Sequence, residues 1–79
     1  MKNAIRLIVG KTISGVVVKE SNRPPRRQVF LVFTDDTYYE IYSTSGEMGW
    51  AGKIDPGGLE GVRRYGRDTH TIVLEELAP

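Results

Sequence analysis

Two hydrophobic runs flank a short polar segment and constrain the fold more than any other feature of this sequence. Residues 29–33 and 38–42 are aromatic and β-branched, and Asp35 and Asp36 lie between them. Such runs favour extended backbone, whereas aspartates tolerate the conformations of a tight turn. The pattern predicts an antiparallel hairpin with Asp35 and Asp36 as a two-residue loop.

A two-residue loop fixes the register of this hairpin, because it places Phe33 opposite Tyr38 and Phe30 opposite Ile41. Alternation of side chains then defines two faces, which are Phe30, Val32, Tyr39 and Ile41 on one side and Val29, Leu31, Phe33, Tyr38, Glu40 and Tyr42 on the other. Both faces are largely hydrophobic. Each face therefore needs something to cover it.

Further strands are expected at both ends of the chain. Residues 12–19 and 69–77 are rich in β-branched side chains, and in the second run Ile72 and Leu74 should share one face, with Val73 and Leu77 on the other. Residues 5–9 fit either a helical turn or a strand, and we expect a strand. Polar, proline-rich residues 20–27 predict an exposed loop, and residues 43–52 predict a glycine-rich loop that carries Trp50.

One short helix is expected over about residues 56–65. Asp55 and Pro56 have the form of an N-cap followed by proline at the first helical position, and Gly66 suits a left-handed terminator. Several glycines weaken this helix, so it must be held by packing of Leu59, Val62 and Tyr65 against the sheet. These elements predict a single α+β domain over residues 1–79, a small antiparallel meander of about four to five strands with one helix. A small, partly open β-barrel is the alternative.

Composition narrows the function classes. The 79 residues hold no cysteine, which excludes disulfide frameworks, zinc–thiolate sites and thiol nucleophiles. The sequence has no run of about 18 apolar residues and no secretory signal pattern, so we expect a cytoplasmic protein that does not enter a membrane. Small domains without such cross-links are marginally stable, which favours a homo-oligomer, most simply a dimer.

Two arginine sets are the candidate polar sites. Arg23, Arg26 and Arg27 surround Pro24 and Pro25 in the predicted loop, where their guanidinium groups suit phosphates or carboxylates. Arg63, Arg64 and Arg67 gather at the end of the predicted helix. The second set also has an ordinary explanation, because basic side chains stabilise a helix C-terminus. Exposed loop arginines, in turn, often serve only solubility.

The aromatic residues offer a second candidate site. Tyr38 and Tyr42 on one strand suit stacking with the bases of a single-stranded nucleic acid, although packing in the core or at an interface is the more common use of such residues and is the one we favour. Trp50 either caps the core or contacts a partner. No motif for a catalytic nucleophile, a metal ion or a nucleotide cofactor is present, and His70 has only Asp68 as a neighbouring carboxylate. We therefore expect neither an enzyme nor a cofactor.

Three functional hypotheses follow. The first is a non-enzymatic binding or assembly domain that self-associates through its second apolar sheet face or an exposed edge strand, or binds a protein partner. The second is a nucleic-acid-binding accessory protein that uses the Arg23, Arg26 and Arg27 loop, with Lys19, Arg63 and Arg64 as further phosphate contacts. The third is a small-ligand protein with a pocket between the sheet, the helix and the Trp50 segment.

Overall fold

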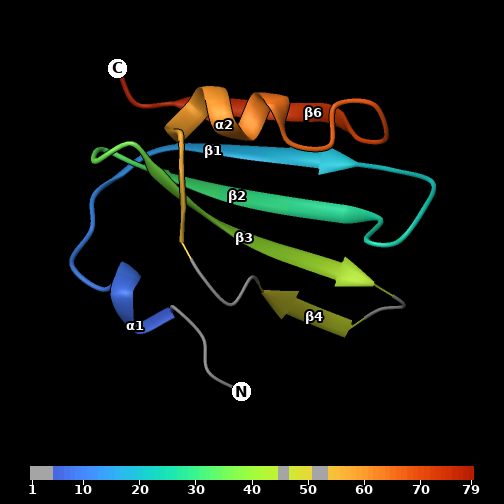
Figure 1. The fold of residues 1–79 in the computed structure, drawn as a ribbon, viewed down its shortest axis with the longest axis horizontal. Coiled ribbons are helices and arrows are strands. Elements are labelled where there is room, and N and C mark those ends of the chain that lie inside the picture. Colours follow the sequence, from blue (N-terminus) through green and yellow to red (C-terminus); the bar gives the residue numbers. More distant parts are fainter. Residues whose placement is uncertain (1–4, 45–46, 51–53) are drawn as a thin grey trace.

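A computed structural model describes residues 5–44, 47–50 and 54–79. Its elements are α1 (Ile5–Ile8), β1 (Ile13–Glu20), β2 (Arg27–Phe33), β3 (Thr37–Thr44), β4 (Glu47–Trp50), β5 (Asp55–Pro56), α2 (Gly58–Arg64) and β6 (Thr71–Leu77). The sheet runs in the order β4-β3-β2-β1-β6 with antiparallel neighbours (Figure 1), and β5 pairs with β3 outside that order. The predicted α+β meander is confirmed. The described strands form an open sheet and not a barrel.

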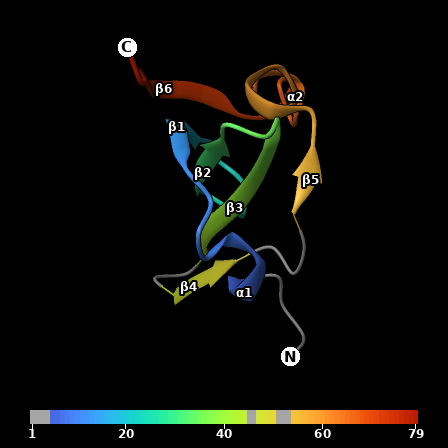
Figure 2. The same cartoon turned by 90° about the vertical axis from the view of Figure 1, so that its left-hand side faces the viewer.

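The main core lies between α2 and one face of the sheet. Its buried members are Val17, Phe30, Val32, Tyr38 and Val62, and Leu59 packs against them. In the side view α2 and β5 lie on one side of the central strands (Figure 2). The prediction that Leu59 and Val62 hold the helix against the sheet is therefore correct.

The hairpin forms where the sequence predicts it, but the predicted register is wrong by one residue. Val32 pairs with Tyr38 and Phe30 pairs with Glu40. The cause is Asp36. This residue adopts a left-handed conformation with φ 64°, and its N–H donates to Phe33 O. This adds a third residue to the loop. Because side chains alternate along a strand, the shift moves Tyr38 and Glu40 onto the α2 face.

The start of α2 also differs from the prediction. Asp55 and Pro56 form β5, which pairs with Thr37 and Tyr38, so they do not cap the helix. The N-cap is Gly57, at φ 109°, and its N–H donates to Asp36 O in the hairpin turn. Tertiary pairing with β3 thus overrides the local capping signal. The predicted left-handed residue after the helix is correct, since Gly66 has φ 63°.

Two further segments differ from the expectations. Residues 5–8 form the single turn α1 and not a strand, and Ile8 packs on Phe33 and Tyr39. The expected loop around Trp50 contains β4, in which Trp50 pairs with Ile41 through the backbone. In both segments contact with the sheet decides a conformation that local propensity leaves open.

The centre of the sheet face opposite α2 is apolar and only half buried. A row of directly opposed residues, Leu74, Val18, Val29 and Ile41, crosses β6, β1, β2 and β3. These four residues, together with Val16 and Leu31, are called the open face below. Val17 and Phe30 on the α2 face are fully buried, whereas the open face is half buried, and Leu74 is 44% exposed.

The β6 strand contains a bulge that changes its faces. Leu74 opposes Val18 and Ile72 opposes Lys19, so the pairing skips Val73. The prediction that Ile72 and Leu74 share a face is therefore wrong, because an extra residue reverses the alternation. Leu74 belongs to the open face and Ile72 to the α2 face.

Candidate functional site

Two segments far apart in the sequence meet at one end of the sheet. The loop of residues 21–26 follows β1, and the turn of residues 65–70 precedes β6. His70 joins them, because its Nε2 lies 3.1 Å from Pro25 O while its Nδ1 lies 2.8 Å from Thr69 Oγ1. Two hollows flank this contact.

The larger hollow, called the arginine cleft, has a volume of about 590 Å³. Its polar lining includes Asn22, Arg26, Arg27, Thr69 and Thr71. Arg27 is neutralised by Glu20, whose Oε2 lies 2.6 Å from Nη2. The guanidinium of Arg26 makes no hydrogen bond or ion pair with any residue in the described ranges. Of the two arginines that line the cleft, Arg26 is therefore the one that can bind an anion.

The smaller hollow, called the tyrosine hollow, measures about 230 Å³ and is lined by Pro25, Glu40, Tyr42 and Tyr65. Glu40 and Tyr42 are two residues apart on β3, so both point to the α2 face. Tyr65 is the C-cap residue of α2, and its ring packs edge-on against Phe30 at 5.9 Å between centroids. Sheet, helix and loop each contribute one wall.

Glu40 gives the tyrosine hollow a negative charge. One carboxylate oxygen, Oε2, accepts a hydrogen bond from the side-chain amide of Gln28. Burial raises the pKa of Glu40 and the nearby Asp55 adds to this increase, whereas the hydrogen bond from Gln28 and the proximity of His70 and Lys19 oppose it. The negative charge of Glu40 is in turn the main cause of the raised pKa of Tyr65. Within the described ranges Glu40 has no ion-pair partner, so its charge is not directly neutralised.

Lys19 lies beneath this region and has a structural role. The residue is 0% exposed, and its ammonium group donates to Val62 O and Tyr65 O at the end of α2. Burial lowers the pKa of Lys19, and Glu40 partly offsets this effect. The suggestion that Lys19 contacts phosphate is therefore wrong, because the ammonium is enclosed by the helix carbonyls.

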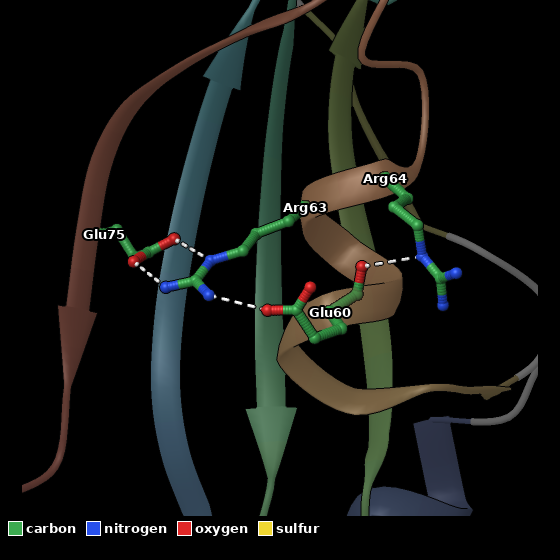
Figure 3. Close-up of polar contacts among 4 residues, drawn as sticks. All are labelled: Glu60, Arg63, Arg64 and Glu75. Atoms are coloured by element: carbon green, nitrogen blue, oxygen red, sulfur yellow. Dashed lines mark hydrogen bonds and ion pairs between the residues drawn. The ribbon is translucent and has the colours of Figure 1, made fainter.

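Arg63 and Arg64 lie on α2 (Figure 3), and neither of them lines the arginine cleft or the tyrosine hollow. Arg63 binds Glu75 of β6 through Nε at 3.1 Å and Nη2 at 2.7 Å, and it binds Glu60 through Nη1 at 2.7 Å. These contacts raise the pKa of Arg63, and the guanidinium lowers the pKa of Glu75. Arg64 donates to Glu60 O at 3.4 Å. Arg63 therefore ties the helix to the edge strand.

No family model, curated protein or solved structure matches this chain. In the part of the chain that the structure describes, no three His, Asp or Glu side chains are placed to hold a metal ion. None of the described helices has the length and apolar character needed to cross a membrane.

The candidate site residues that the sequence predicts do not all lie in one place in the structure. Arg26 and Arg27 share the arginine cleft, whereas Arg23 is exposed in the same loop and does not line it. Tyr42 lines the tyrosine hollow, but Tyr38 is 7% exposed and packs in the core, where a ligand does not reach it. The side chain of Trp50 lies outside the described residues.

Sequence reasoning missed Glu40 and Tyr65 as site residues. Glu40 is the only charged residue within residues 37–44, which is a detectable signal for a functional carboxylate. Tyr65 was expected only to pack the helix against the sheet. It does contact Phe30, but it is also 46% exposed and forms a wall of the hollow.

Proposed function

We propose that this chain is a non-enzymatic assembly domain that forms a homodimer through its open face. The observation that supports the proposal is the apolar row of Leu74, Val18, Val29 and Ile41, which crosses four strands on the side away from α2. Monomeric proteins rarely expose a continuous apolar surface of this kind. A second copy is the simplest cover.

A stable domain normally packs its sheet between other layers, and here α2 supplies such a layer on only one face. On the other face Ile8, Ile54, Leu31 and Ile41 pack against Phe33 and Tyr39, so that end of the face is partly covered within the chain. Two copies stacked face to face would bring two sheets to about 10 Å, the spacing of a β-sandwich. Each copy would then complete the core of the other.

Substitution of Leu74 by lysine tests this proposal. Leu74→Lys places a charge on the exposed end of the apolar row and should weaken dimerisation at least about tenfold, because a buried unpaired charge is costly at an interface. The measurement is sedimentation equilibrium or light scattering over a range of protein concentrations. Ile72→Lys is the matched control, since Ile72 lies on the same strand but faces the α2 side.

The control should dimerise like the original chain, and circular dichroism should show both variants folded. A chain that is monomeric at tens of micromolar would contradict the proposal. Equal weakening by both substitutions would also contradict it, because that result would place the contact at the strand edge and not at the open face.

A second candidate function is nucleic-acid binding at the arginine cleft. The observation that favours it is the unpaired guanidinium of Arg26 in the same cleft as the hydroxyl group of Thr71. Guanidinium and hydroxyl groups are common donors to backbone phosphates.

Fluorescence anisotropy with single- and double-stranded oligonucleotides at about 50 and 200 mM salt tests this function, because phosphate contacts make affinity fall steeply with salt. Arg26→Ala should weaken binding several-fold and reduce the salt dependence. Arg64→Ala removes the same charge outside the cleft and should have a smaller effect. Absence of binding at the lower salt concentration would exclude this function.

A further inference from the structure

The tyrosine hollow combines aromatic walls with one carboxylate. Tyr42 and Tyr65 contribute rings, Pro25 contributes an apolar ring, and Glu40 contributes the charge. Aromatic faces attract cations through their quadrupoles, and this attraction is strongest where water is partly excluded. The lining therefore suits a cation better than a neutral or anionic ligand.

The charge around Glu40 supports the same conclusion. Its carboxylate is half buried and has no ion-pair partner within the described ranges. The buried cation Lys19 directs its protons to the carbonyl oxygens of Val62 and Tyr65. Burial raises the pKa of Glu40, which indicates a carboxylate that a bound cation would stabilise.

Size and hydrogen bonding narrow the class of cation. A volume of about 230 Å³ is below the roughly 300–1,000 Å³ of pockets for drug-sized ligands, so the hollow suits a single headgroup. A guanidinium prefers two free carboxylate oxygens, but the Gln28 amide already occupies Oε2 of Glu40. A quaternary ammonium needs no hydrogen bonds and loses little hydration when it enters an aromatic site.

We propose that the tyrosine hollow binds a quaternary ammonium group, with Tyr42 and Tyr65 contacting its methyl groups and Glu40 balancing its charge. The site lies on the α2 face, opposite the surface proposed for dimerisation. Binding and dimerisation are therefore independent, and either proposal can fail without affecting the other.

The test compares choline with 3,3-dimethyl-1-butanol, a neutral molecule of the same shape. Both are titrated into the isotopically labelled protein, and amide chemical shifts around Glu40, Tyr42 and Tyr65 are followed by NMR. Choline should produce saturable shifts at these residues, and the neutral analogue should bind at least about tenfold more weakly. Equal binding of the two would overturn the proposal, because it would show a merely hydrophobic hollow.

Substitutions of Glu40 and Tyr42 test which side chains contact the bound choline. Glu40→Gln keeps an acceptor for the Gln28 amide but removes the charge, and it should weaken choline binding at least about tenfold. Glu76→Gln is the matched control, since it makes the same change in net charge at an exposed position of β6. Tyr42→Phe should retain binding and Tyr42→Leu should lose it, because the ring face is the contacting group.

Equal effects of Glu40→Gln and Glu76→Gln would contradict a local role for the carboxylate. Equal binding by Tyr42→Phe and Tyr42→Leu would contradict an aromatic contact. Free phosphocholine and trimethyllysine carry the same trimethylammonium group. The compound that binds more tightly indicates whether the natural ligand is a phosphocholine or a methylated lysine. Absence of binding by choline and by both of these compounds would overturn the proposal.

Discussion

Replacement of Phe30 by alanine should lower the free energy of unfolding by about 3–5 kcal/mol, the usual cost of removing a buried phenyl ring. Phe30 is 0% exposed and lies at the centre of the α2-side core. Its ring makes edge contacts with Tyr38 at 5.8 Å and Tyr65 at 5.9 Å, and the Lys19 ammonium lies 5.3 Å from its centroid. The substitution therefore removes a contact shared by sheet, helix and buried lysine.

Urea denaturation followed by circular dichroism measures this effect. Domains of this size have stabilities at the low end of about 5–15 kcal/mol, so Phe30→Ala should be largely unfolded or close to it. Phe30→Leu retains most of the apolar volume and should cost clearly less. A loss below about 1 kcal/mol for the alanine variant would show that the core does not depend on this ring.

Replacement of Lys19 by methionine should have the next largest effect and lower the free energy of unfolding by about 2–4 kcal/mol. Methionine fills a similar volume but donates no hydrogen bonds, so Val62 O and Tyr65 O would lose the lysine as their partner. A buried carbonyl without a partner costs about 1–3 kcal/mol. Because Lys19 contacts the last turn of α2, the loss should appear first as fraying of this helix.

Hydrogen exchange of the α2 amides, together with denaturation, checks this expectation. The control is Lys11→Met, which removes a lysine that pairs with the partly exposed Asp35 and should cost less than about 1 kcal/mol. Similar losses in the two variants would contradict a specific role of Lys19 at the helix end. Unchanged protection of α2 in Lys19→Met would contradict it as well.

The sequence predicts those parts of the fold that local chemistry controls. The hairpin, the short helix and the first and last strands all follow from side-chain periodicity and from Gly66. The register does not follow, because it depends on whether the single residue Asp36 adopts a positive φ. Two adjacent aspartates suit a two-residue loop and a three-residue loop about equally well. One torsion angle therefore decides which face each side chain of β3 occupies.

The candidate sites were less predictable than the fold, for related reasons. Glu40 reaches the tyrosine hollow only because of the shifted register. The predicted register places Glu40 on the face of the sheet opposite to the one that carries Phe30. Both hollows also depend on the contact between His70 and Pro25, which are 45 residues apart in the sequence. Reading of local patterns does not reveal a contact at this separation.

The bulge at Val73 limits how far an association of this chain through its strand edge would extend. β6 ends the strand order, and an edge strand with free backbone groups can add further strands without limit. A bulge and the neighbouring Glu75 and Glu76 make this edge a poor template for such growth. A face-to-face contact, by contrast, is fully used once two copies meet about a twofold axis. Association through the open face would thus close at a finite particle, whereas growth along the edge would give fibres.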